Sequence, residues 1–242
     1  MPKINKDSTL NITFVGIGLC LLCSAIISFI AIQLRSVQEN NVVLDMQKKI
    51  VSSAGLDEVY GSVENAMSNI KTLIIDLDRG EIVDINPDTY ELSKELREDG
   101  KYKFLSAEED VASIKKREKY SKVYIEYKDN EINTLILPVR GYGLWGILYG
   151  YLAIEGDFNT VAGLEFYEHK ETPGLGAEID NPKWKALWKG KKIYQENGEV
   201  SLKVIKGSVM KTSDNFSYEI DGLSGATLTC NGVSNLIAYW MG

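Results

Sequence analysis

The segment that most constrains this chain lies near its N-terminus and carries no charge. Residues 8–34, between Asp7 and Arg35, are 27 consecutive uncharged residues, and residues 12–34 are almost wholly apolar. Because an α-helix rises ~1.5 Å per residue, about 20 apolar residues cross the ~30 Å hydrocarbon layer of a bilayer. We therefore predict a transmembrane helix over residues 10–34.

Three other interpretations fit this segment less well. A cleaved signal peptide has an apolar region of ~7–15 residues followed by a small-residue cleavage site, whereas this run is longer and no such site follows. A lipoprotein anchor needs a modifiable cysteine after a small residue, but Cys23 follows two leucines in the middle of the run. A buried helix of a soluble protein rarely stays apolar on every face for about six turns.

The charges that flank the segment predict its orientation. Lys3 and Lys6 precede it, whereas Arg35 is followed by two acidic residues before the next lysine. This bias favours a cytoplasmic N-terminus and an exported remainder. The predicted organisation is a cytoplasmic segment 1–9, the span 10–34, a helical linker 35–57 and a periplasmic domain 58–242.

Charge and composition narrow the class of protein. Of 27 basic and 34 acidic residues, removing Lys3, Lys6 and Asp7 leaves 25 and 33 for the rest of the chain, a net charge of −8. There is no long basic run, which argues against nucleic acid as a partner. The 44% hydrophobic content and the lack of low-complexity tracts indicate a folded domain rather than a disordered one.

The three cysteines are divided between the predicted span and the exported domain. Cys20 and Cys23 lie three residues apart on one face of the predicted span, a spacing that also occurs in zinc and redox sites. Free cysteines in lipid act as small apolar side chains, and no second pair completes a site, so we interpret them as part of the span. Cys230 is the single cysteine of the exported domain, which therefore has no internal disulfide.

Hydrophobic periodicity predicts an α+β domain with a mostly antiparallel sheet and flanking helices. Helical patterns cover residues 36–56, the charged segment 88–121, a short stretch that begins at Asn181-Pro182 and ends at Gly190, and the terminal segment 230–241. We interpret residues 88–121 as a solvated peripheral segment. Strand patterns at hairpin spacing cover residues 72–77, 81–85, 123–127, 134–139 and 145–154. A further hairpin is predicted from Lys191 through Asn197-Gly198. Trp184 and Trp188, four residues apart, are expected in the core.

Three glycine-containing segments are candidates for chemistry: residues 140–146, 163–176 and 221–229. The third, D-G-L-S-G-A-T-L-T, opens the terminal helix. A small-residue loop of this kind lets backbone N–H groups approach an anion at a helix N-terminus. Ser224, Thr227 and Thr229 add hydroxyls. The alternative interpretation is a simple helix cap, with Thr229 as the capping residue.

The motifs in these segments resemble one family. D-G-L-S-G-A-T matches the flavinylation motif D-x-x-[ST]-G-A-T. The chain also contains, in the family's order, V-R-G-Y-G-L-W-G, G-L-E-F-Y-E-H-K-E-T-P-G-L-G and W-K-A-L-W-K-G-K-K before that motif. With its single N-terminal span, nearly the whole chain is similar to the C subunit of the sodium-translocating NADH:quinone oxidoreductases.

The resemblance implies a covalent cofactor. In this family FMN is attached through its phosphate to the threonine of S-G-A-T, which here is Thr227. A separate flavin transferase, with FAD as donor, installs it. Ser224 is then expected to donate to phosphate oxygens, while Gly225 and Ala226 leave room for the transferase.

The resemblance also suggests which residues hold the isoalloxazine ring. Glu171 and Thr172 are expected to bond its polar edge, and Leu175 and Gly176 to lie against its face. Further candidates are Leu144 and Trp145, which would pack nearby, and Lys206, which would stabilise negative charge on the flavin. No catalytic residue is predicted. His169 is the single histidine, so no metal site or catalytic triad is expected, and we interpret it as a residue that positions its loop.

The expected function is that of a membrane-anchored electron-transfer subunit of the bacterial inner membrane. The complex would pass electrons from NADH to ubiquinone and drive Na⁺ outward, with the FMN-bearing B subunit and the D and E subunits as the main partners. No dinucleotide fingerprint and no acidic residue in the span occur, so the NADH site and the ion path belong to other subunits. Two alternatives stay open: the G subunit of an Rnf-type electron-transport complex, and a non-redox membrane-anchored scaffold.

Overall fold

The computed structural model describes residues 8–242. It contains two compact units, one that ends at Asp45 and one that spans Met46–Gly242. Residues 1–7 of the predicted cytoplasmic segment 1–9, including Lys3 and Lys6, lie outside the described residues. The predicted boundaries of the span, linker and exported domain stay predictions.

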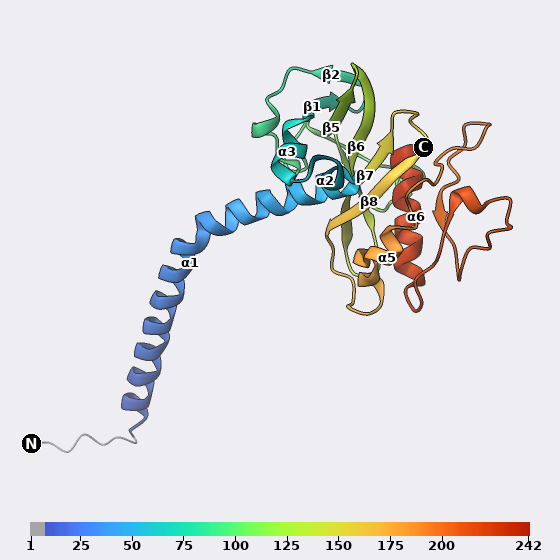
Figure 1. The fold of residues 1–242 in the computed structure, drawn as a ribbon. Helices are drawn as coiled ribbons and strands as arrows, with labels where there is room; N and C mark the ends of the chain where they lie inside the picture. The colour runs from blue at the N-terminus through green and yellow to red at the C-terminus, as the bar shows by residue number, and fades with distance from the viewer. Residues whose placement is uncertain (1–7) are drawn as a thin grey trace, which may run out of the picture. The chain divides into compact units, whose positions relative to one another are not determined.

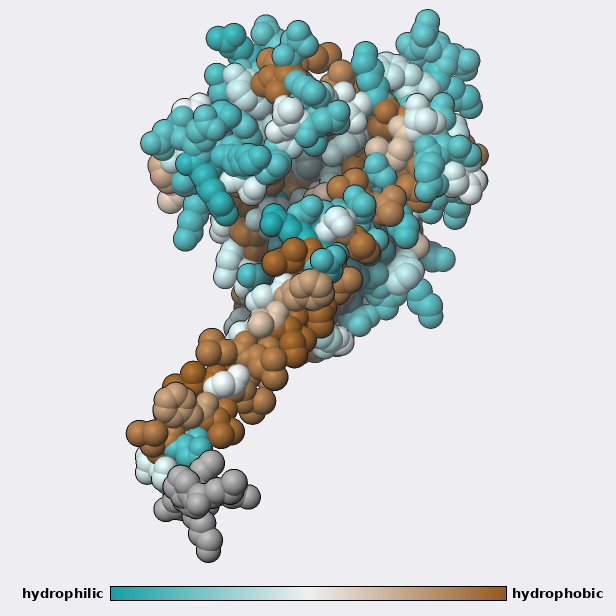
Figure 2. Space-filling view, turned by 90° about the vertical axis from the view of Figure 1, so that its left-hand side faces the viewer, coloured by the Kyte–Doolittle hydropathy of each residue, from teal (hydrophilic) through white to brown (hydrophobic). Residues whose placement is uncertain are grey.

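The first unit is built on the helix α1, Thr9–Ser53, which continues into the second unit. An 18-residue window of α1 has a mean hydropathy of 2.6 and none of it is buried, so the helix is long and apolar enough to cross a membrane. Figure 2 shows hydrophobic side chains along the visible face of this helix. The Ser24 hydroxyl donates to the Cys20 carbonyl at 2.7 Å, so this polar group is satisfied within the helix.

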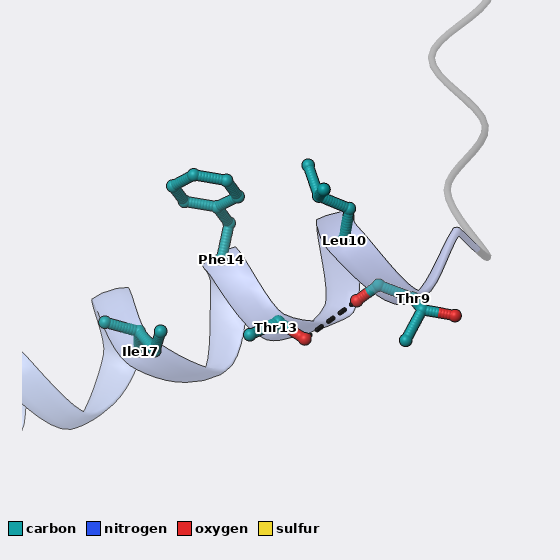
Figure 3. Close-up of a pocket in the computed structure, with 5 residues that line it drawn as sticks. All are labelled: Thr9, Leu10, Thr13, Phe14 and Ile17. Carbon is teal, nitrogen blue, oxygen red and sulfur yellow. Dashed lines mark hydrogen bonds between the residues drawn. The ribbon is translucent and has the colours of Figure 1, made fainter.

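A shallow depression lies on the N-terminal turns of α1 (Figure 3). Its lining consists of Thr9, Leu10, Thr13, Phe14 and Ile17. The Thr13 hydroxyl donates to the Thr9 carbonyl at 2.8 Å, so the surface is left mostly apolar. All five residues come from successive turns of one helix, and lipid chains fill such a space in a bilayer. We assign no ligand to it.

The second unit is organised around a six-stranded antiparallel sheet (Figure 1). Its strands are β1 Ile70–Asp76, β2 Glu81–Val83, β5 Tyr120–Lys128, β6 Glu131–Tyr142, β7 Ile147–Glu155 and β8 Val161–Glu168, in the order β2-β1-β5-β6-β7-β8. The β5–β6 hairpin turns at Asp129 and Asn130, both with positive φ, as a two-residue hairpin loop requires. The predicted α+β class and antiparallel sheet are confirmed. The sequence patterns did not predict β8, which overlaps the glycine-containing segment 163–176.

Alternating side chains give the sheet two apolar faces. Leu148 and Leu152 on β7 belong to one core cluster, whereas Tyr151 belongs to a second cluster on the other face. The first face is covered by the terminal helix α6, Thr227–Met241, and by Trp184 and Trp188. The second is covered by the last turns of α1 and by two short helices, α2 Leu56–Tyr60 and α3 Val63–Ser68.

The prediction of helix over residues 88–121 was wrong. This segment contains short elements instead: η1 Pro87–Thr89, α4 Leu92–Glu95, β3 Tyr102–Phe104 and β4 Lys116–Glu118. The charge pattern of residues 88–121 indicated solvent exposure, whereas contacts with distant segments determine the backbone conformation. Glu118 forms a buried ion pair with Arg140 on β6. The Asp110 carboxylate accepts the Ile114 N–H at 2.7 Å, which closes a loop.

The remaining elements connect the sheet to α6. They are η2 Gly176–Asp180, α5 Pro182–Lys185, β9 Lys203–Val204, η3 Phe216–Tyr218 and β10 Glu219–Ile220. Trp184 and Trp188 are buried, as predicted, and their rings meet edge to face at 5.5 Å. The short helix ends at Lys185, before Gly190. The predicted hairpin around Asn197 is short, with one antiparallel bridge between Tyr194 and Val200, and β9 pairs in parallel with β10.

Candidate functional site

The three glycine-containing segments meet at the side chain of Glu171. Its Oε1 accepts hydrogen bonds from the backbone N–H groups of Leu144 and Trp145, both at 3.0 Å. Its Oε2 accepts a hydrogen bond from the Thr229 hydroxyl at 2.5 Å. Glu171 is only 5% exposed. One buried carboxylate therefore joins the β6–β7 turn, the segment after β8 and the first turn of α6.

Glycines make this close meeting possible. A Cβ at Gly143 would lie 2.7 Å from Glu171 Oε1, and a Cβ at Gly176 would lie 2.6 Å from Oε2. On α6, a Cβ at Gly232 would lie 2.3 Å from the Tyr142 carbonyl oxygen. Real Cβ atoms do not approach oxygen this closely, so a larger residue at any of the three positions would move one segment away from another.

Thr227, which ends the S-G-A-T turn, and Thr229, two residues later, differ in their exposure to solvent. Helix α6 begins at Thr227 after Gly225, whose φ of +72° is in the left-handed region that favours glycine. Thr227 is exposed, whereas Thr229 is fully buried at 0% exposure. The cap position is Ala226, and no side chain caps the helix. The interpretation of Thr229 as the N-cap was therefore wrong, and the helix starts three residues earlier than Cys230.

A cavity of about 390 Å³ lies beside this turn. Four predicted site residues line it together: Ser224, Gly225, Thr227 and Lys206. Residues that the sequence analysis did not single out also line it: Val204, Ile205, Gly207, Ser208, Gly222, Leu223, Cys230 and Asn231. Asn231 had a sequence signal, because it follows Thr227 by four residues and so shares its helix face. Val204, Ile205, Gly207 and Ser208 had none.

Two side chains hold the loops around this cavity. The Asp221 carboxylate accepts the Val209 N–H at 2.7 Å, and the Asp221 carbonyl accepts the Trp184 indole N–H at 2.8 Å. The Cys230 Sγ accepts the Leu223 N–H at 3.2 Å. Burial raises the pKa of the Cys230 thiol, so the group stays protonated near neutral pH. Asp221 and Leu223, in the first half of the D-G-L-S-G-A-T motif, are thus fixed to neighbouring segments of the domain.

Exposed apolar side chains lie next to the same turn. Trp145 is 61% exposed, Leu175 is 45% exposed and Leu144 is 38% exposed. We call these three residues the apolar rim. A Cβ on Gly225 would lie 3.0 Å from Leu175 Cδ2, so the rim reaches the S-G-A-T turn. Apolar surface beside a cavity that carries a few polar side chains is typical of small-molecule and cofactor sites.

Two further predicted residues lie at the same place. Thr172 is exposed, and its carbonyl accepts the N–H groups of Leu175 and Ala177, both at 3.1 Å. His169 contacts the Asp180 carboxylate through Nε2 at 2.8 Å, and its Nδ1 accepts the Glu171 N–H at 3.2 Å. The histidine therefore positions the loop that carries Glu171. That Glu171 and Thr172 bond the ring's polar edge stays a prediction.

The residues present fit a flavin mononucleotide. The exposed Thr227 hydroxyl at a helix start, with Ser224 and Lys206 on the same cavity, suits a phosphate group. The apolar rim suits the ring. A family model described as an FMN-binding domain matches residues 143–242, which contain the apolar rim, Glu171 and the S-G-A-T turn. Fold and site thus define an FMN-binding domain on a chain with one candidate membrane span.

Comparisons over the whole chain show the particular family. The C subunit of the Na⁺-translocating NADH-quinone reductase from Pseudomonas aeruginosa is 46% identical, with 98% of this chain and 93% of that protein covered. The same protein from Vibrio anguillarum is 41% identical, with 98% and 92% covered. The crystal structure of NqrC from Shewanella oneidensis has a TM-score of 0.71 at 29% identity, with 81% and 90% covered. That of the C subunit from Parabacteroides distasonis has a TM-score of 0.61 at 29% identity, with 85% and 92% covered.

This chain belongs to the family of NqrC, the C subunit of the Na⁺-translocating NADH-quinone reductases. It is a subunit of a multi-subunit complex and carries an FMN-binding domain. The resemblance drawn from the sequence motifs is confirmed. The relatives named above favour it over the Rnf-type G subunit, and the match to an FMN-binding domain favours it over a non-redox scaffold.

Proposed function

We propose that this chain carries FMN covalently on Thr227 and relays electrons within a Na⁺-translocating NADH:ubiquinone oxidoreductase. The observation that carries the proposal is the contrast between the two threonines of S-G-A-T-L-T. Thr227 is exposed and lines the cavity of about 390 Å³, whereas the Thr229 hydroxyl is buried and donates to Glu171. An enzyme that modifies one of them in the folded domain can reach only the first.

Covalent attachment of FMN needs an accessible hydroxyl group and a molecule that donates the FMN group. In the step we propose, Thr227 Oγ1 loses its proton and forms a bond to the flavin-side phosphorus of FAD, the pyrophosphate bond breaks, and AMP and the proton leave. A separate flavin transferase supplies the active site for this step. Gly225 and Ala226 carry little or no side chain next to Thr227, which leaves the hydroxyl open to it.

The chain's own residues then hold the cofactor. The first N–H groups of α6 have no acceptor within the helix, so they favour a phosphate anion, and Ser224 and Lys206 lie on the same cavity. The apolar rim, with Thr172 and Gly176, would hold the ring. When bound, FMN supplies the capacity to accept and release electrons, while these residues set its position and electrostatic environment.

The proposal includes a location and partners. The B, D and E subunits of the complex are the expected neighbours. The span anchors the chain in the bacterial inner membrane, and the FMN-binding domain lies in the periplasm. A covalent link suits that compartment, because a dissociated flavin would be lost there.

In-gel flavin fluorescence tests the attachment. The full chain is co-expressed with a flavin transferase as wild type, Thr227→Val and Thr229→Val, denatured and separated by electrophoresis. We expect fluorescent bands for wild type and Thr229→Val, and none for Thr227→Val. A fluorescent Thr227→Val band, or a colourless wild type, would overturn the proposal. Near-ultraviolet circular dichroism of each protein before denaturation confirms that the variants are folded.

A further inference from the structure

The geometry around Glu171 points to a role that differs from direct contact with the cofactor. We propose that Glu171 is a positioning residue, whose carboxylate fixes the β6–β7 turn against α6 and thereby sets the place of Leu144 and Trp145. This inference rests on the proposed flavin site. It deepens that proposal by naming the group that assembles the ring-binding surface.

The Glu171 carboxylate is already occupied by donors from the protein. A carboxylate has about four acceptor positions. Those of Glu171 receive two backbone N–H groups from the β6–β7 turn and the Thr229 hydroxyl. Three of four are therefore used within the protein, at 5% exposure. Hydrogen bonds to an ionised acceptor are the stronger ones, so this group can hold a short turn in one conformation.

The β6–β7 turn that Glu171 holds carries two residues of the apolar rim. The last paired residues of the hairpin are Tyr142 and Ile147, and the Gly143 N–H donates to the Gly146 carbonyl at 2.8 Å. Leu144 and Trp145 form the tip, with their side chains exposed and their N–H groups on Glu171. A hairpin tip is ordinarily among the more mobile parts of a domain. Here the buried carboxylate ties the tip to the helix that begins at Thr227.

Two glycines leave the space that the Glu171 carboxylate occupies. Gly143 and Gly176 flank it, and a Cβ on either would lie within 2.7 Å of one of its oxygens. Gly146, in the same turn, offers a matched control. A Cβ there would lie 3.3 Å from Lys170 Cδ, which belongs to a flexible side chain. The first two glycines, but not Gly146, are therefore needed for the carboxylate to sit between the segments.

Amide hydrogen exchange tests the inference without any flavin. In the full chain with Thr227→Val, we expect slow exchange at the Leu144 and Trp145 amides. Adding Glu171→Leu is expected to speed exchange at both by at least about tenfold, because the charged acceptor is lost. Adding Glu171→Gln is expected to leave most of the protection, since an amide oxygen still accepts. Unchanged exchange at both amides in Glu171→Leu would overturn the inference.

The glycine pair gives an independent result if Glu171→Leu does not fold. We expect Gly143→Ala to speed exchange at Leu144 and Trp145, and Gly146→Ala to leave it close to the Thr227→Val protein. Equal effects of the two substitutions would contradict the role of the carboxylate.

Flavin spectroscopy separates positioning from general stability. In chains that retain Thr227, Glu171→Leu and Gly143→Ala are expected to keep the fluorescent band of covalent flavin, but to change the flavin's visible circular dichroism and midpoint potential. Glu171→Gln and Gly146→Ala should resemble wild type in both. If the wild type carries no covalent flavin, the proposed function fails, while the exchange experiment still decides the role of Glu171.

Discussion

At the scale of single residues, the site depends on which side of a helix a hydroxyl faces. Thr227 and Thr229 are two positions apart, so about 200° of rotation separates them on α6. One is exposed, and the other is buried with its hydroxyl on Glu171. The sequence offers two similar hydroxyls, and the packing of α6 against the sheet leaves one of them open to modification.

The buried threonine has a stability role that can be measured. Thr229→Val keeps the shape of the side chain but leaves Glu171 Oε2 without its donor. We expect a loss of about 1–3 kcal/mol in the free energy of unfolding, the usual cost of a buried polar group left unpaired. Thr229→Ser keeps the hydroxyl and should lose less. Urea unfolding of the purified full chain in detergent, followed by tryptophan fluorescence, compares the two, and an equal loss in both variants would contradict this account.

At the scale of elements, α6 and β6 approach each other through glycine. Gly232 on α6 lies against the Tyr142 carbonyl, and Gly141 on β6 lies against Leu236, where an added Cβ would meet the leucine Cβ at 2.8 Å. The Trp240 indole also donates to the Arg140 carbonyl at 2.7 Å. This contact brings the start of the β6–β7 turn to the helix that carries Thr227, and so places two parts of the site together.

Because α6 and β6 approach so closely, we expect Gly→Ala in this helix to lower the stability of the protein rather than raise it. In an exposed helix, Gly→Ala stabilises by up to about 1 kcal/mol. At Gly232 the new methyl group would meet backbone, so we expect a net loss of about 1–3 kcal/mol or more. Asn235→Ala, at an exposed position of the same helix, is the control and should change stability by less than about 0.5 kcal/mol. Thermal unfolding of the full chain compares them; a stabilised Gly232→Ala protein would show that the helix can move without cost.

At the scale of the whole chain, one apolar helix and one acidic domain divide the tasks of anchoring and cofactor binding. The helix α1 is long and apolar enough to cross a membrane. The second unit contains the sheet, both core clusters and all the predicted site residues. Between Thr9 and Leu34, α1 has no charged residue.

The orientation of the chain is testable with reporter fusions. Lys3 and Lys6 predict a cytoplasmic N-terminus, so alkaline phosphatase fused after Gly242 should be active in the periplasm. A green fluorescent protein fused at the same position should stay dark if it is exported unfolded. Replacing Lys3 and Lys6 by glutamate while adding lysines after Arg35 should shift the population toward the opposite pattern. Active phosphatase with unchanged yield in that variant would contradict the charge-based argument.

Local patterns were enough to predict several parts of this protein. An uncharged run of 27 residues, 8–34, predicted the span, because the bilayer thickness fixes the number of apolar residues required. Alternating apolar residues predicted five of the six strands of the main sheet, because burial on a strand repeats every second residue. The order of the glycine-containing motifs identified the family and singled out Thr227.

The tertiary structure decided what local pattern does not encode. The bonds that assemble the site join residues 27 and 58 positions apart, Leu144 and Thr229 to Glu171. The charged segment 88–121 is a loop with short elements because Arg140, on a distant strand, pairs with its Glu118. The same holds for residues 204–208, which reach the cavity only through the folding of the chain. The sequence alone determines which residues are buried, turned or exposed over a few positions. Contacts between distant segments depend on the packed fold as a whole, and these contacts decide which threonine is open and how the ring-binding surface is built.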